Sequence, residues 1–188
     1  MIKIEDFPML SNNITTLQET SKDDHDGKNR YITHLMLEVV NFDSVKNDYI
    51  KNLHLNDTPT SNDALYIGNK NHLVFIEFKN GQIDQKVSAN IRRKIYDSIA
   101  ILTDIIGKGI SFTRYNLDYI LVYNEDKNIK ENINKHIMNK SREKIIKFGL
   151  DRFKNFFFKD VYTLNDKEFS DFILNLTKDE SEILKLIL

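Results

Sequence analysis

Cysteine is absent from this chain of 188 residues. Without thiols the protein can form neither disulfides nor thiolate zinc sites. No stretch approaches the roughly 18 consecutive apolar residues that a membrane-spanning helix needs, so the sequence predicts no membrane partner. The first ten residues, MIKIEDFPML, lack a cationic stretch followed by an apolar one. We therefore expect a cytoplasmic protein and not a secreted one.

Length and charge set the next limits. A chain of this length holds one domain with a substantial core, and we expect a single α/β domain over residues 30–188. Residues 11–29 are polar and lack apolar periodicity, which predicts a flexible or loosely packed N-terminal segment over residues 1–29. The net charge is −1, yet residues 127–154 hold nine Lys or Arg against three acids, a local charge of +6. That segment predicts a nucleic-acid-binding face, with an ordinary solvated helix face as the alternative.

The run HLVFIEFK, residues 72–79, is apolar and rich in β-forming residues, and it predicts a strand. Alternate side chains of a strand point to opposite faces. Val74, Ile76 and Phe78 form a wholly apolar face, which favours packing under a helix. The other face carries Leu73 and Phe75 and ends in Glu77 and Lys79, a carboxylate beside an ammonium.

A second strand is predicted just before this one, over residues 63–68, with the turn Gly68-Asn69-Lys70-Asn71 between them. If the loop has three residues centred on Lys70, the numbers of paired residues sum to 140, and Asp63 lies opposite Glu77. Opposed Cβ atoms are about 5 Å apart, so the two carboxylates could share one divalent cation. A two-residue turn would shift this register by one residue.

The spacing D-x13-E-x-K, from Asp63 through Glu77 to Lys79, resembles the PD-(D/E)xK nuclease superfamily over residues 30–125. Asn62 stands where the family name has proline, a position that the chemistry does not require. An ordinary Glu/Lys ion pair at the end of a strand is the alternative interpretation.

The resemblance implies a restriction-endonuclease-like fold: an α/β protein with a mixed sheet flanked by helices, here with a C-terminal helical extension. It also implies Mg²⁺-dependent hydrolysis of phosphodiesters in nucleic acid, with Mn²⁺ as a substitute ion and DNA favoured over RNA. The metal ligands would be Asp63, Glu77, the backbone carbonyl of Phe78, and Glu38 from the first helix. Lys79 would orient water or stabilise developing charge. The alternative is a non-catalytic nucleic-acid or protein-binding module with the same fold.

Apolar periodicity and turn residues predict the remaining elements. One helix or a broken pair of helices is expected over 30–53, and further helices over 87–106, 129–148, 166–176 and 180–188. Strands are expected over 116–124 and 161–164, with one further strand around 108–114, which an αβββαβ core would need.

Five basic residues are predicted to contact nucleic-acid phosphates. Arg92 and Lys94 fall on opposite rims of the apolar stripe of the helix over 87–106. Lys140, Lys144 and Lys147 belong to the basic helix. The sequence leaves open whether the protein forms a homodimer.

Overall fold

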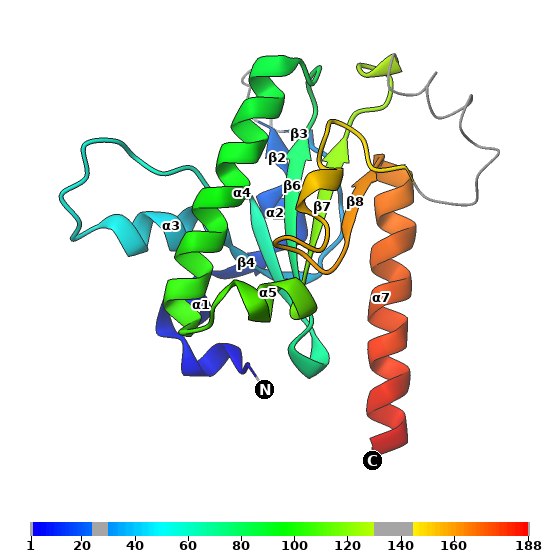
Figure 1. Ribbon diagram of the computed structural model, residues 1–188. Helices are drawn as coiled ribbons and strands as arrows, with labels where there is room; N and C mark the ends of the chain where they lie inside the picture. The colour runs from blue at the N-terminus through cyan, green and yellow to red at the C-terminus, as the bar shows by residue number, and fades with distance from the viewer. Residues whose placement is uncertain (1, 24–29, 130–144, 188) are drawn as a thin grey trace.

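The computed structural model describes residues 2–23, 30–129 and 145–187. Its centre is a six-stranded mixed sheet in the order β1-β4-β5-β6-β7-β8 (Figure 1). These strands are β1 (Ile14–Thr16), β4 (Glu38–Asn41), β5 (Ala64–Ile67), β6 (Leu73–Lys79), β7 (Leu117–Tyr123) and β8 (Val161–Leu164). The predicted class, a mixed α/β sheet flanked by helices, is confirmed. A separate pair, β2 (Lys22–Asp23) and β3 (Arg30–Tyr31), forms a second small sheet.

The helices lie on both sides of the sheet and at its ends. They are α1 (Pro8–Ser11), α2 (Leu17–Thr20), α3 (Phe42–Ile50), α4 (Gln85–Ile106), α5 (Ile110–Asn116) and α7 (Asp166–Ile187), with 3-10 turns at Ile4–Asp6, Asn69–Asn71 and Asp151–Phe153. Strands β1, β4, β5 and β6 pair antiparallel, whereas β6, β7 and β8 pair parallel, with α4 and α5 in the connection from β6 to β7. Among the described residues, none of these helices is long and apolar enough to cross a bilayer.

The hairpin between β5 and β6 has the predicted register. Ala64 pairs with Ile76 and Ile67 with Leu73, so paired residue numbers sum to 140. The Gly68 N–H donates to the carbonyl of His72 at 2.8 Å, which closes a loop of three residues. One step beyond the Ala64–Ile76 pair, the same register places Asp63 opposite Glu77.

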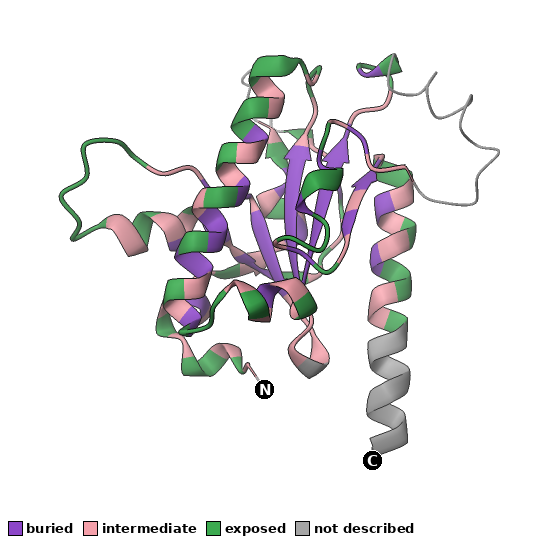
Figure 2. Ribbon diagram, viewed as in Figure 1, coloured by how far each residue is buried: buried purple, intermediate pink, exposed green. Residues whose placement is uncertain are grey.

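The two faces of the sheet bury separate apolar clusters, and the central strands are purple along their length in Figure 2. On one face, Leu73 and Phe75 pack with Ile91 and Ile95 of α4. On the other face, Val74, Ile76 and Phe78 pack with Phe169 and Ile173 of α7. The prediction that this second face lies under a helix is confirmed.

Helix α4 follows its sequence signals closely. The Asp84 side chain accepts a hydrogen bond from Val87 N at 2.8 Å and so caps the helix, and Gly107, with φ of +60°, ends it in the left-handed conformation. A glycine there avoids the steric cost that a Cβ would bring. The predicted strands over 116–124 and 161–164 are confirmed as β7 and β8, and the two predicted C-terminal helices are one continuous helix, α7.

The predicted helix over 30–53 is wrong in its first half. Residues 38–41 form β4, and α3 begins only at Phe42, after the Asn41 side chain accepts from Ser44 N at 3.0 Å. Val39 and Val40 are β-branched and buried, and they are more stable between two neighbouring strands than in a helix. The apolar residues over 30–53 have helical spacing only by coincidence, because a short strand is followed directly by a helix.

Three other predicted segments also differ. Residues 110–116 form α5 and not a strand, and the strand that pairs antiparallel with β5 on the side away from β6 is β4. The N-terminal segment that was predicted to be flexible or loosely packed contributes β1 and α2 to the fold and buries Leu17 completely. Of the predicted basic helix, residues 130–144 lie outside the described residues, and 145–148 are not helical.

Candidate active site

Asp63 and Glu77 converge on one point at the end of the β5–β6 hairpin. Asp63 directly precedes β5 and Glu77 lies near the C-terminal end of β6. The Lys94 ammonium of α4 lies between them, 3.0 Å from Asp63 Oδ1 and 2.8 and 3.0 Å from the two Glu77 oxygens. Because one nitrogen contacts both carboxylates, the predicted opposition of the two acids is matched by their side-chain positions.

The remaining atoms of the predicted site lie around this pair. Lys79 Nζ is 2.5 Å from Glu77 Oε1. The Phe78 N–H donates to Asp63 Oδ2 at 2.7 Å. Since the N–H and C=O of a strand residue face the same neighbouring strand, the Phe78 carbonyl also faces the edge at which Asp63 lies. The structure therefore brings together the three residues of the D-x13-E-x-K pattern and the residue between Glu and Lys.

Burial dominates the electrostatics of Glu77, whose side chain is fully buried. Burial and the nearby charge of Asp63 raise the pKa of Glu77 to about 7, while Lys94 and Lys79 oppose the rise. Burial would lower the pKa of Lys94, but the charges of Glu77 and Asp63 outweigh it and hold that pKa above its ordinary value. The Lys94 ammonium thus stays charged, and Glu77 is the group that titrates near neutrality.

Two buried polar groups near the carboxylates have no hydrogen-bond partner among the described residues: the side-chain amide of Asn62 and the hydroxyl of Tyr119. Burial, followed by the charges of Glu77 and Asp63, raises the pKa of Tyr119. Buried polar groups usually have partners, and such groups concentrate where water or an ion belongs.

A groove of about 710 Å³ opens beside the carboxylates, between the β2 segment, the start of α3, the end of β6 and the start of α4. Its charged and amide-bearing lining residues include Lys22, Asp23, Asp43, Asp63, Lys79, Lys86 and Asn90. Asp63 and Lys79 therefore face the open groove, whereas the fully buried Glu77 does not line it.

Asp43 and Asp23 are the acidic residues of this groove that the sequence analysis did not place at the site. Asp43 lies in the first turn of α3. Its Oδ1 accepts a hydrogen bond from Ser61 Oγ at 2.5 Å, and the Phe42 N–H donates to the Asp63 carbonyl at 3.1 Å. These contacts fix the first turn of α3 against the hairpin. Asn41, a favoured N-cap residue, was the signal that could have located this turn.

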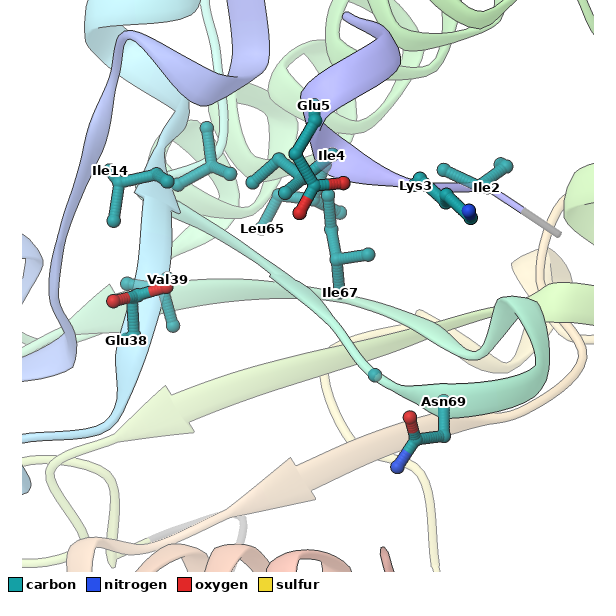
Figure 3. Close-up of a pocket in the computed structure, with 12 residues that line it drawn as sticks. Ile2, Lys3, Ile4, Glu5, Ile14, Glu38, Val39, Leu65, Ile67 and Asn69 are labelled. Atoms are coloured by element: carbon teal, nitrogen blue, oxygen red, sulfur yellow. The ribbon is translucent and has the colours of Figure 1, made fainter. Parts of the chain in front are cut away.

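Glu38 is far from the site, so its predicted place in the metal shell is wrong. It lies in β4, which runs antiparallel to β5, and it is displaced toward the Ile67 end of β5, opposite to the Asp63 end. Glu38 lines a separate cavity of about 240 Å³. Figure 3 shows the side chain of Glu38 among the residues around this cavity. The cavity is also lined by Ile4, Glu5, Ile14, Leu65 and Ile67.

The predicted phosphate-binding residues have different environments from those expected. Lys94 is held between the carboxylates and does not lie on the helix surface. Lys147 is buried, and its ammonium contacts the Tyr123 hydroxyl and lies 4.6 Å from the centre of that ring. Arg92 donates to Ser88 Oγ at 2.9 Å within α4. Lys140 and Lys144 lie outside the described residues.

The donor atoms fit a hard divalent cation. Mg²⁺ prefers oxygen ligands and is commonly bound through one or two carboxylates while it keeps several waters. Asp63, Glu77 and the Phe78 carbonyl provide such a set, next to a groove that admits water. Among the described residues there is no cluster of three acidic, histidine or cysteine side chains suited to a metal ion. Any cation bound here would rely on two carboxylates, backbone and solvent.

The raised pKa of Glu77 predicts a pH dependence of stability without metal. Since the folded state holds the proton more tightly than the unfolded state, the free energy of unfolding should fall as pH rises from about 4.5 to about 7 and level off above it. At about 1.4 kcal/mol per pKa unit, this contribution is at most about 3 to 4 kcal/mol. Urea unfolding in EDTA, with wild type compared with Glu77→Gln at each pH, measures it. A difference between the two proteins that does not change with pH would contradict the prediction.

Comparison with known proteins gave no match to a family model, to a curated protein or to a solved structure. What the site can do is therefore argued from its geometry.

Proposed function

We propose that this protein hydrolyses phosphodiester bonds of nucleic acid, DNA in preference to RNA, with Mg²⁺ as cofactor. The observation that carries the proposal is the convergence of Asp63 and Glu77 on one cationic position at the edge of a groove, with Lys79 directly beside it. Phosphodiester hydrolysis needs an activated water, neutralised charge on phosphorus and help for the leaving oxygen. A bound Mg²⁺ would supply Lewis-acid and water-activating chemistry.

Each residue of the site has its own role in the proposed reaction. Asp63, Glu77 and the Phe78 carbonyl would hold the cation, and the Phe78 N–H holds Asp63 in orientation. The Lys79 ammonium lies at the groove wall, where it can orient the attacking water or stabilise negative charge on a phosphate oxygen. Glu77 must lose its proton to act as a ligand, because a protonated carboxyl is a poor one.

The order of the elements also supports the proposal. Strands β4, β5 and β6 pair antiparallel, and α4 then leads to β7, which is parallel to β6. This order is consistent with the βββαβ part of the αβββαβ core that the sequence resemblance implies. Two departures from it are α3, which lies between β4 and β5, and α5, which lies between α4 and β7.

A cleavage assay tests the proposal directly. Wild-type protein with Mg²⁺ or Mn²⁺ should cleave at least one of single-stranded DNA, double-stranded DNA, branched DNA and RNA, and EDTA should stop cleavage. Asp63→Asn keeps the shape of the side chain but removes its charge, and it should be inactive on the same substrate. Metal-independent cleavage, or equal activity of Asp63→Asn, would contradict the proposed site.

Lys86 offers a test of the groove as the nucleic-acid-binding surface. It is exposed and lines the groove at the start of α4, whereas Lys108 is exposed just beyond the opposite end of the same helix. Lys86→Glu should weaken DNA binding and reduce the slope of log affinity against log salt by about one, the effect of one lost phosphate contact. Lys108→Glu makes the same change in net charge and should leave both quantities unaltered. Fluorescence anisotropy over a salt series measures them; equal effects of the two changes would indicate a general charge effect only.

One observation favours a second function, a non-catalytic nucleic-acid or protein-binding module. The two carboxylates are already neutralised by Lys79 and Lys94. A site of this kind could serve only to hold the hairpin against α4. Binding of nucleic acid without cleavage by wild type, on every substrate and with either metal, would favour this function.

A further inference from the structure

The Lys94 ammonium lies where a cation shared by the two carboxylates would lie. Three of the four oxygens of Asp63 and Glu77 are 2.8 to 3.0 Å from its Nζ, and the fourth accepts from the Phe78 N–H. Every oxygen of the pair therefore has a protein donor. The position that a shared metal ion would take is therefore filled by the Lys94 ammonium.

The charges at the site prevent Lys94 and a metal ion from contacting the same carboxylate oxygens at the same time. When both carboxylates are ionised, as metal binding requires, their charges and those of the Lys79 and Lys94 ammoniums sum to zero. A divalent cation placed among the same three oxygens would lie in contact with the Lys94 ammonium, and like charges repel strongly where water is largely excluded. The Lys94 side chain is only 15% exposed, so solvent screens this repulsion weakly. Metal and Lys94 cannot both occupy the position.

We propose that Lys94 is an internal counter-cation: it holds Asp63 and Glu77 together in the metal-free protein, and it withdraws when a divalent cation binds. This inference rests on the proposed function and specifies how metal binding at that site is regulated. Asn90, one helical turn earlier on α4, lines the groove, and the four-carbon stem of lysine is flexible enough to turn in that direction. A metal ion then binds in exchange for the Lys94 ammonium, so removing that ammonium raises the affinity of the site for metal.

Metal binding measured by calorimetry tests the exchange. Lys94→Met keeps the apolar stem without the charge, and it should bind Mn²⁺ at least tenfold more tightly than wild type. Lys79→Met is the matched control, because it removes the same charge from the same site while its ammonium contacts Glu77 Oε1 and not the shared position. Its affinity should change less. Equal gains in the two variants would show a general charge effect and overturn the exchange, as would unchanged or weaker binding by Lys94→Met.

Thermal unfolding gives a second readout that does not depend on activity. In EDTA, Lys94→Met should melt below wild type, because the buried Glu77 and its neighbour Asp63 lose their shared counter-charge. Saturating Mn²⁺ should raise its melting temperature by more than it raises that of wild type, since tighter binding stabilises more. An equal or smaller rise would overturn the inference.

Wild-type protein can be tested even if Lys94→Met does not fold. In protein carrying ¹³C-labelled lysine, the Lys94 Cε resonance should move when Mg²⁺ is added, with its assignment confirmed by Lys94→Arg. The Lys108 resonance, at the far end of the helix, should not move. A Lys94 resonance that is unchanged at a Mg²⁺ concentration that saturates the site would overturn the inference.

Failure of the inference and failure of the proposed function give different results. If wild type binds metal and cleaves but Lys94→Met binds no more tightly, only the exchange is wrong. If both proteins bind Mn²⁺ with the expected difference but wild type cleaves no substrate, the exchange stands and the proposed nuclease function is wrong. If only Lys94→Met binds Mn²⁺, Lys94 blocks the site permanently, and the exchange is overturned together with the metal-dependent activity. If neither protein binds Mn²⁺, both are wrong.

Discussion

Replacing Lys79 by alanine is expected to lower phosphodiester cleavage by roughly 100-fold or more, the scale of losing one contact made in the transition state. The ammonium lies at the wall of the groove and 2.5 Å from Glu77 Oε1, so it is next to any phosphate that reaches the carboxylates. Binding of DNA should change little, because one ammonium is a small part of a phosphate-binding surface. Single-turnover rates and anisotropy on the same substrate, with Mg²⁺ at saturation, separate the two effects.

Lys108→Ala is the control, since it removes an exposed lysine far from the groove and should leave the rate unchanged. Circular dichroism of Lys79→Ala should match wild type, because Lys94 still neutralises the carboxylates. A loss of rate that follows a parallel loss of DNA affinity would mean that Lys79 binds substrate uniformly and has no part in the chemical step.

Phe75→Ala is expected to produce the largest loss of stability, about 3–5 kcal/mol. Phe75 is fully buried in the middle of β6, two residues before Glu77, and its ring meets that of Phe42 edge-on at a centroid distance of 4.8 Å. Truncation removes a large apolar surface and leaves a cavity between the sheet, α4 and the start of α3. Since domains of this size are stable by only about 5–15 kcal/mol, the change should be plain in urea unfolding.

Phe156→Ala is the matched comparison, because Phe156 is 53% exposed although its ring also contacts that of another phenylalanine. It should destabilise the protein by much less. Similar losses for both variants would mean that β6 is not the centre of the core. Mn²⁺ binding by Phe75→Ala should weaken too, since β6 positions Glu77 and the Phe78 carbonyl.

The sequence by itself determined the hairpin that carries the site. The apolar, β-forming run over residues 72–79 predicted the strand and which of its side chains share a face, and the glycine and asparagines predicted the turn before it. The structure then selected the three-residue loop, with the register that sums to 140, over the two-residue turn that the sequence left open. Helix α4 was equally predictable, because its amphipathic stripe, its Asp84 cap and its Gly107 end are local signals. All of these depend on contacts between residues close in the chain.

Only the tertiary structure decided which charged residues meet. Glu38 and Asp43 are five positions apart, yet one lies at the far end of β5 and the other in the groove, because a short strand intervenes where helical spacing suggested a helix. Lys94 appeared on the rim of an apolar stripe, and whether such a residue faces solvent or a buried carboxylate depends on how the helix packs across β6. Periodicity gives the face of a helix and not its partner, since the partner is chosen by packing between distant segments.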